Sequence, residues 1–421
     1  MSMSFTDTAN TAGTEPLPLE GVTVIELGNV VMVPFAAQLL GDLGARVIRI
    51  EGERKDSGRV IGGVVAPGLS GAALNLQRNK ESIQLDLKSA DGLEIAHRLV
   101  AGADVFVTNM RRGALGRLGL DHDTVVEVNP AIIYVAANGF ADGSPDADRP
   151  AFDDIIQAET GLPALTGRIT GRPRFLPTLI ADKLSGMYVV QGVLAALVRR
   201  GVTGRGGVVE VPMFDSVLSF NLVEHLAGAA IEGGHAGYSR ILSEHRGPHR
   251  TKDGWVAVMP YSDEDWRALY EHVGRGDELD DPIFQDHALR LENPDIVYKS
   301  LAEVMAQGTT QEWVDLCFEL GVPAAPIHDL DEVVDDPGLH RGVIADATHP
   351  VVGAYRHVHY PVRFDGEHTP VRTHAPLIGE NTEALLAELG YDEDDTARLL
   401  AAGAATAASL DEAADAFTRQ R

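Results

Sequence analysis

The stretch VTVIELGNVVMVPFAAQLLGDLGARVIRIE, residues 22–51, is the most informative part of the sequence for predicting the fold. Residues 22–27 and 45–51 are mainly apolar runs typical of buried strands, and residues 34–44 between them have the composition of a short helix. Pro34 suits the first position of that helix, where its missing N–H costs nothing. A strand, a helix and a second strand in such close succession predict a βαβ unit, and with it a parallel sheet.

The same alternation continues along the next hundred or so residues. Further strands are expected at 81–87, 104–109 and 131–139, with helices near 90–101 and 114–127. A loop-rich segment is expected at 151–175, then a long helix to Arg200 and one more turn and strand. This order predicts an α/β fold with a doubly wound, Rossmann-like large domain.

The sequence pattern changes in the later part of the chain, where a hairpin and small amphipathic helices are expected from residue 247 to about 320. We therefore predict a smaller α+β domain inserted into the large one. The predicted boundaries are a flexible leader at 1–18, the large domain at 19–228 and 335–421, and the small domain with its linkers at 229–334.

Composition and charge limit the kinds of partner and the location that suit this chain. The chain is 44% hydrophobic and 23% charged, as folded proteins are, and its net charge of −27 argues against nucleic-acid or anionic-membrane partners. Its one cysteine, Cys317, lies in a helical pattern and is expected to be a buried core thiol. We recognise no targeting peptide and no apolar run long enough to span a membrane, so a cytoplasmic protein is expected.

Four familiar kinds of site fit the sequence poorly. Glu51 stands where a dinucleotide-binding enzyme places its ribose-binding acid, but the preceding turn, GNVVMVP, has one glycine where pyrophosphate binding needs three. His357 and His359 would share one face of a strand, yet no third ligand stands in register, so no metal site is expected. The chain also has no serine-hydrolase elbow and no Walker A loop.

Basic residues gather in the first domain of this acidic chain, several of them where loops should follow strands. Such a cluster suits a multiply phosphorylated ligand, although a solvated surface explains it as well. Its members are Arg46, Arg49, Arg54, Lys55, Arg59, Arg78, Lys80, Arg111, Arg112 and Arg117.

A single acid interrupts the apolar stretch FLPTLIADKLSGMYVVQGVLAAL, residues 175–197. Taken alone, Asp182 is best explained as the N-cap of the long helix, placed between a strand and the helix. A carboxylate at a helix start is also held rigidly and kept ionised by the helix dipole and its N–H groups. The position therefore suits a nucleophile as well as a cap.

Segments spread over residues 20–390 resemble the class III CoA-transferases, the group of formyl-CoA transferase, carnitine CoA-transferase and α-methylacyl-CoA racemase. No single segment identifies the family, but the occurrence of all of them in the same order along the chain is specific for it. They are the opening βαβ stretch, NKESIQLDLK, DVFVTNMRRGALGRLGL, FDDIIQAETGLPALTG, IADKLSGMYVVQGVLAALVRRGVTGRGGVVEVPMFDS, GVPAAPIHDLDEV and APLIGENTEALLAELG.

The resemblance implies covalent catalysis by Asp182, which matches the family's nucleophile and would form an aspartyl-CoA thioester. A CoA thioester would be the substrate, with no permanently bound cofactor and no metal. Matching positions that hold the nucleotide in relatives are Leu85, Asp86, Leu87, Lys88, Asn109, Met110, Arg111 and Arg117. Matching positions on the path to the thioester are Val31, Met32, Ala151, Phe152 and Asp153.

Two departures from the family bear on the substrate. Relatives have Gly-Pro after a polar or small residue where this chain has VMVP, residues 31–34, and SRILSEHRGPHRTKDG has no clear counterpart of the glycine-rich loop of formyl-CoA transferase. A small carboxylic, possibly dicarboxylic, acid is expected as acceptor, its second carboxylate pairing with Arg240, Arg246 or Arg250.

Two alternatives remain at this stage, an α-methylacyl-CoA racemase and a noncatalytic acyl-CoA-binding protein. The racemase branch uses a histidine where this chain has Phe152, which cannot carry a proton, so transfer is favoured. A noncatalytic binding protein would tolerate loss of Asp182. The resemblance further implies an interlocked homodimer, with which the long connections at about 225–250 and 328–350 are compatible.

Overall fold

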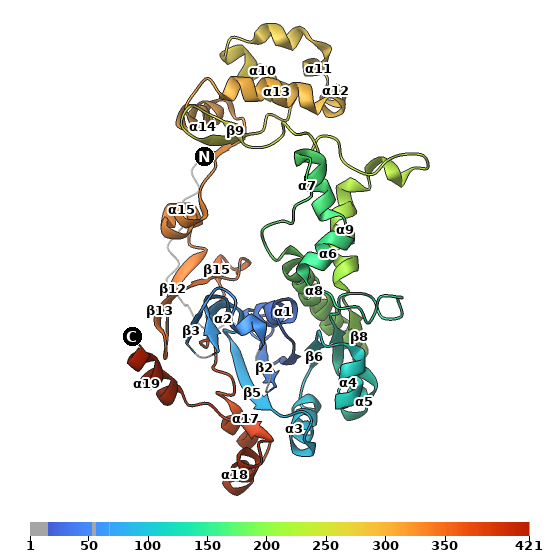
Figure 1. Ribbon diagram of the computed structural model, residues 1–421, viewed down its shortest axis with the longest axis vertical. Helices are drawn as coiled ribbons and strands as arrows, with labels where there is room; N and C mark the ends of the chain where they lie inside the picture. The colour runs from blue at the N-terminus through green and yellow to red at the C-terminus, as the bar shows by residue number, and fades with distance from the viewer. Residues whose placement is uncertain (1–15, 53–55, 67, 421) are drawn as a thin grey trace. The chain divides into compact units, whose positions relative to one another are not determined.

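The computed structural model describes residues 16–52, 56–66 and 68–420, which divide into two compact units (Figure 1). The sheet unit holds residues up to 150 together with 181–213 and 343–421, and the second unit holds 151–180 and 214–342. The predicted boundaries differ from this division at 151–180, 214–228 and 335–342, all of which were assigned to the large domain. Residues 1–15 of the predicted leader lie outside the described residues.

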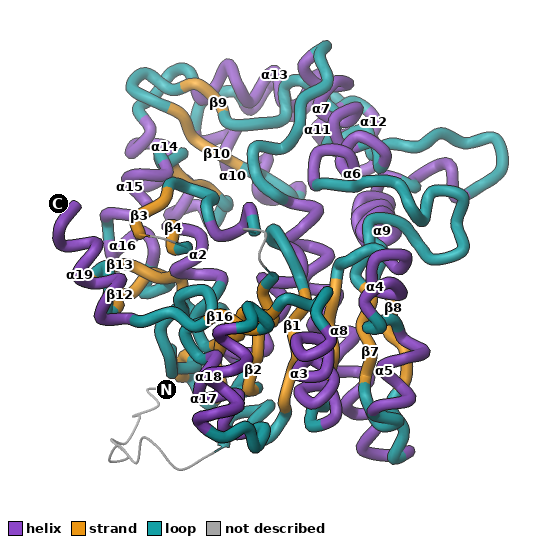
Figure 2. Tube along the Cα trace, turned by 60° about the horizontal axis from the view of Figure 1, so that its bottom comes forward, coloured by secondary structure: helices purple, strands orange, loops and turns teal. Residues whose placement is uncertain are grey.

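A seven-stranded sheet is the framework of the sheet unit (Figure 2). Its order, β16-β5-β2-β1-β6-β7-β8, is that of a doubly wound sheet, and β16 adds an antiparallel edge to six parallel strands. The strands are β1 (Thr23–Leu27), β2 (Arg46–Glu51), β5 (Lys80–Leu85), β6 (Val105–Thr108), β7 (Ile133–Ala136), β8 (Gly207–Glu210) and β16 (Ala405–Thr406).

One face of the sheet carries an apolar core formed with helices. Ile25, Ile48, Ile83 and Phe106 alternate with residues of the opposite face, as a strand's period of two requires, and pack in one cluster with Leu99 of α3. The helices that contribute to this cluster are α3 (Ala90–Ala101), α4 (Arg112–Leu118), α5 (His122–Val128), α17 (Thr382–Glu388) and α18 (Glu393–Ala401).

Helices α1 (Met32–Asp42) and α8 (Ile180–Thr203) pack closely against each other. A Cβ built on Gly186 of α8 would lie 2.9 Å from the carbonyl oxygen of Met32 and 3.0 Å from the ring of Phe35. Glycine at position 186 therefore allows the backbones of the two helices to come together.

The strands expected for the parallel sheet are confirmed, whereas three expectations, about residues 114–127, 151–175 and Asp182, are wrong. The helix expected at 114–127 is two helices, because Gly119 takes a left-handed conformation and Asp121 caps a new start. The segment 151–175 contains α6 (Asp153–Glu159) and α7 (Leu162–Thr170), whose glycine and threonine content suggested loop. Asp182 is not the N-cap, since α8 already begins at Ile180 and no strand precedes it.

The sheet unit also carries short elements outside the main sheet. They are η1 (Ser57–Arg59), β3 (Val64–Ala66), β4 (Leu69–Ser70), α2 (Gly71–Leu76), β12 (Ile344–His349), β13 (Gly353–Val358), β14 (Arg363–Phe364), β15 (Glu367–His368) and α19 (Leu410–Gln420).

The second unit packs helices around a small antiparallel sheet of order β11-β10-β9, and Cys317 is buried in its core, as predicted. Besides α6 and α7, its elements are α9 (Met213–His225), η2 (Ala227–Ala230), β9 (His249–Arg250), β10 (Trp255–Val258), α10 (Asp263–His272), η3 (Gly276–Asp280), α11 (Pro282–Gln285), α12 (His287–Glu292), α13 (Pro294–Met305), α14 (Thr310–Leu320), β11 (Ala324–Pro326), α15 (Leu330–Asp335) and α16 (Pro337–His340).

Helix α8 is, by length and composition alone, long and apolar enough to cross a membrane, contrary to the expectation that no segment would be. Core helices pass the same test. Ala181, Val189 and Val193 of α8 are fully buried, and Gly186 lies against α1. We therefore interpret α8 as a core helix.

The close approach at Gly186 yields a stability prediction. Gly186→Ala should lower the free energy of unfolding by about 1–3 kcal/mol, because the added methyl group overpacks the contact with Met32 and Phe35. Gly201→Ala is the matched control on the same helix, with nothing within 4 Å of its Cβ, and should raise stability by up to about 1 kcal/mol. Urea denaturation measures both, and equal stability of the two variants would contradict the packing described here.

Candidate active site

A cavity of about 740 Å³ opens at the carboxyl ends of the parallel strands. The strand order reverses between β1 and β6, and ligands of doubly wound sheets bind in the crevice at such a reversal. The cavity is lined by Leu27, Gly28, Asn29, Arg49, Ile50, Glu51, Gly52, Asp56, Leu85, Asp86, Leu87, Lys88, Leu93, Met110, Ala114, Arg117, Leu118 and Ile378.

Most residues expected to hold a nucleotide lie on this cavity. The segment 85–88 follows β5, Met110 follows β6 and Arg117 lies on α4, and all of them line its wall. Two others do not. The amide of Asn109 accepts a hydrogen bond from the backbone N–H of Asn29 and donates one to its carbonyl, each at 2.9 Å, and Arg111 is an exposed residue that precedes α4.

Lys88 and Arg117 are the exposed cations of the cavity. Neither forms an ion pair with another residue in the part of the chain that the structure describes. The surrounding wall is apolar, with Leu85, Leu93 and Leu118 among its members. A pocket with an apolar wall and a few cations at its rim suits an anionic ligand with an apolar or aromatic part.

The other expected site residues fall into two groups. Val31 and Met32 are buried at the start of α1, directly after the loop that forms one wall of the cavity. Ala151, Phe152 and Asp153 belong to the second unit, at the start of α6. There Asp153 is buried and accepts a hydrogen bond from Gln157, whereas the ring of Phe152 is 64% exposed.

Asp182 is buried in the first turn of α8. It stands one helical turn before Gly186, so the two residues share a face of the helix, and that face meets the start of α1. The positive end of the α8 dipole favours a carboxylate at this position. The structure thus places Asp182 on the helix face that packs against the residues following the cavity loop.

A buried network of charges underlies the cavity, and the sequence did not reveal it. Arg49 contacts Glu26 at 2.8 Å, Glu51 at 3.2 Å and Asp56 at 2.6 Å. Arg59 pairs with Glu51, and the Nζ of Lys80 lies 2.8 Å from Glu26. All six side chains are almost entirely buried. One feature of the sequence could have indicated the network. Arg49 stands between two isoleucines on a buried strand, so its charged side chain must point toward a packed face of the sheet.

The network determines the charge states of its members. Burial alone would raise the pKa of Glu51, but its ion pairs with Arg49 and Arg59 outweigh burial and lower the pKa to about 2. Burial lowers the pKa of Lys80 to about 8, an effect that the adjacent Glu26 partly offsets. Glu51 is therefore an ion-pair partner, bound also by the hydroxyl of Ser82, and not a ribose ligand.

The expectation that the basic cluster forms a phosphate-binding surface is mostly wrong, because acids in the sequence neutralise it. Arg46 binds Glu81 and Glu388, Arg78 binds Asp42, and Arg49, Arg59 and Lys80 belong to the buried network. Of the described members, Arg49 and Arg117 border the cavity. Arg54 and Lys55 lie outside the described residues.

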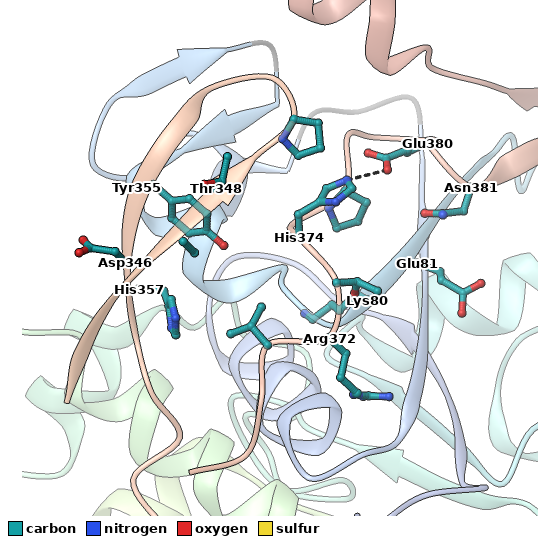
Figure 3. Close-up of a pocket in the computed structure, with 15 residues that line it drawn as sticks. Lys80, Glu81, Asp346, Thr348, Tyr355, His357, Arg372, His374, Glu380 and Asn381 are labelled. Atoms are coloured by element: carbon teal, nitrogen blue, oxygen red, sulfur yellow. Dashed lines mark hydrogen bonds and ion pairs between the residues drawn. The ribbon is translucent and has the colours of Figure 1, made fainter. Parts of the chain in front are cut away.

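A second cavity, of about 620 Å³, lies beside the β12–β13 hairpin and the segment 371–381 (Figure 3). Several of its charged groups already have partners. Lys80 is bonded to Glu26, to the carbonyl of Pro34 and to Gln77, and Arg372 donates to two backbone carbonyls. His374 is paired with Glu380. No three or more histidine, cysteine or acidic residues among those described are placed to hold a metal ion.

Comparisons with known proteins point to one family over nearly the whole chain. The model of CoA-transferase family III matches residues 19–382. Human succinyl-CoA:glutarate CoA-transferase is 30% identical over 396 residues, which are 92% of this chain and 89% of the human one. The β subunit of succinyl-CoA–L-malate CoA-transferase from Chloroflexus aurantiacus is 30% identical over 387 residues, covering 89% and 95%. Formyl-CoA:oxalate CoA-transferase of Escherichia coli O157:H7 is 28% identical over 411 residues, covering 91% and 98%.

Solved structures share the fold. A CAIB/BAIF family protein from Brucella suis superimposes with a TM-score of 0.75 at 28% identity, covering 89% of this chain and all of that one. A hypothetical protein from Mycobacterium tuberculosis gives a TM-score of 0.76 at 29% identity, covering 88% and 100%.

The low pKa of Glu51 predicts acid sensitivity. Because its folded-state pKa lies below the unfolded value, Glu51 contributes stability above about pH 4.5 that is lost as pH falls toward 2. Glu51→Gln should cost about 3 kcal/mol of unfolding free energy at pH 7, and this difference from wild type should narrow between about pH 5 and about pH 3.

Glu94→Gln serves as the control, since its pair with Arg98 is exposed and should contribute little to stability at any pH. Urea denaturation across this pH range measures all three proteins. A Glu51→Gln difference that does not change with pH would show that Glu51 is not ion-paired as described.

Proposed function

The chain belongs to CoA-transferase family III, and from this premise we propose that it moves coenzyme A from an acyl-CoA donor to a small dicarboxylic acid by way of Asp182. The observation that carries the proposal is the position of Asp182, buried in the first turn of α8 on the face that packs against the start of α1. The residues just before α1 form a wall of the cavity. A carboxylate and a binding cavity thus adjoin the same short segment.

The reaction uses the carboxylate of Asp182 as a nucleophile. It attacks the thioester carbonyl of the donor, and the C–S bond breaks to give a mixed anhydride and the thiolate of CoA. The thiolate then attacks the Asp182 carbonyl of the anhydride, which releases the donor acid and leaves an aspartyl-CoA thioester. The acceptor carboxylate attacks the carbonyl of that thioester, which gives a second mixed anhydride and releases the CoA thiolate. The thiolate then attacks the acceptor carbonyl of this anhydride, which forms the new acyl-CoA and restores the carboxylate of Asp182. A carboxylate ionised at neutral pH needs no general base for this.

The cavity offers suitable contacts for the nucleotide end of CoA. Its apolar residues can cover the adenine, while Lys88 and Arg117 at the rim can bind phosphate groups as cations do. The volume of about 740 Å³ lies in the range typical of ligand sites. CoA acts here as a substrate that leaves with the product.

Relatives support a dicarboxylic acceptor. The three relatives compared above are named for glutarate, L-malate and oxalate, each a dicarboxylic acid. Of the arginines expected to bind the second carboxylate, Arg240 donates to the hydroxyl of Tyr298 and Arg250 lies over the ring of Trp255. The Nε of Arg246 is buried without a hydrogen-bond partner among the described residues, which makes Arg246 the better candidate.

Transfer is preferred to racemisation because Phe152 offers no proton-carrying group at the start of α6. The protein acts as a homodimer in this proposal. Val198 and Val202, one turn apart on α8, are 70% and 84% exposed, and burial of such a face by a partner subunit would be favourable.

Loss of the nucleophile should abolish transfer. Asp182→Asn preserves size but removes the attacking carboxylate, so acyl exchange should fall at least about a thousandfold. The assay incubates enzyme with succinyl-CoA and a panel of small acids and detects new CoA thioesters by mass. Asp91→Asn, an exposed acid in the first turn of α3, is the control and should keep full activity. Near-normal turnover by Asp182→Asn would contradict the mechanism.

Loss of the rim cations should weaken binding of the CoA substrate. Lys88→Met and Arg117→Met should each raise KM for the acyl-CoA about threefold to tenfold with kcat nearly unchanged, because each removes one phosphate contact. Arg112→Met is the matched control on α4, since Arg112 pairs with Asp142 and does not line the cavity. Equal KM values in the Arg117 and Arg112 variants would contradict the proposed orientation of CoA.

A further inference from the structure

The loop between β1 and α1, residues 28–31, has a strained backbone. Val30 adopts a φ of 66°, in the left-handed region that β-branched residues rarely enter. Such a conformation persists only where surrounding contacts impose it. The loop has contacts of this kind on both sides, and its residues Gly28 and Asn29 line the cavity.

Asp56 holds one side of the loop. One carboxylate oxygen accepts hydrogen bonds from the backbone N–H of Val30 at 2.8 Å and of Gly58 at 3.0 Å. The other oxygen lies 2.6 Å from the guanidinium of Arg49. Asp56 is 8% exposed, so these are hydrogen bonds and an ion pair in a largely water-free environment, where each is strong. The carboxylate thereby connects the loop to the buried charge network.

Two further contacts fix the same loop. A Cβ built on Gly58 would lie 2.2 Å from the carbonyl oxygen of Val30, so the backbone at position 58 abuts the loop directly. On the opposite side, the amide of Asn109 forms its reciprocal pair of hydrogen bonds with Asn29. Val30 is thus held by its N–H and by its carbonyl, and no residue larger than glycine fits at 58 without displacing it.

We infer that Asp56 is a positioning residue for CoA transfer, a role that rests on the proposed function of Asp182. At one end of the loop lie Gly28 and Asn29, which line the cavity, and at the other lies Met32, whose carbonyl contacts the helix of Asp182. The conformation of Val30 sets the distance between these ends. Asp56 therefore sets where a bound thioester lies relative to the nucleophile, and no contact of Asp56 with the substrate is required.

Asp56→Ala removes the acceptor for Val30, whereas Asp56→Asn keeps an oxygen that can accept from the same N–H and loses the charge and the acceptor toward Arg49. Asp56→Ala should lower kcat on the order of a hundredfold with a smaller change in KM, as misplacement of reacting groups does. Asp56→Asn should recover at least about tenfold of that loss. Gly58→Ala leaves Asp56 intact and should reproduce the loss in kcat by pushing on Val30.

Asp42→Ala is the control for lost stability, because it breaks the equally buried pair with Arg78 without touching the loop. Its kcat should stay within about threefold of wild type. Hydrogen exchange at the amide of Val30 supplies a readout that needs no catalysis, and Asp56→Ala should speed it while Asp42→Ala does not. Absence of transfer by wild type would refute the proposed function alone. Unchanged exchange at Val30 in Asp56→Ala, or equal kcat losses in the alanine variants of Asp42 and Asp56, would overturn the positioning role.

Discussion

The pairing of three buried bases with three buried acids is the interaction on which the sheet unit depends. Arg49, Arg59 and Lys80 meet Glu26, Glu51 and Asp56 on one face of the central strands. A buried ion pair contributes little net stability over an apolar pair, but removing one partner leaves a charge that nothing solvates. The network therefore acts chiefly as a constraint. It requires these strands, and the loop attached through Asp56, to adopt one arrangement.

That constraint explains why the acidic chain can keep a basic cluster inside its first domain. The bases do not serve a ligand together, because most are paired with acids on neighbouring strands, on helices α1 and α17 or in the loop at Asp56. Lys88 and Arg117 are left exposed at the rim, where phosphate binding is expected. Arg49, Glu51 and Asp56 of the network also line the cavity, so its wall combines paired, buried charges with the two exposed cations at the rim.

The cavity residues 85–88, Met110 and Arg117 were expected from the family resemblance. Local pattern predicted the parallel strands well, because these follow from period-two apolar runs. It failed where the deciding contact is long-range. Glu26 and Arg49 lie 23 residues apart in the chain, so their pairing leaves no local mark. The start of α8 was placed three residues late, since an aspartate suits the first turn as well as the cap. The role of Asp182 came from resemblance, which no local pattern supplies.

In the proposed reaction the carboxylate of Asp182 becomes covalently bound to CoA during turnover. The most direct measurement is to incubate the wild-type protein with succinyl-CoA, add hydroxylamine and map the modified peptide by mass spectrometry. A hydroxamate is expected on Asp182, within the peptide that contains TLIADKLSG, and only when the CoA thioester is present. An unmodified Asp182 in protein that is actively exchanging CoA, or a hydroxamate on another acid, would contradict the proposed reaction.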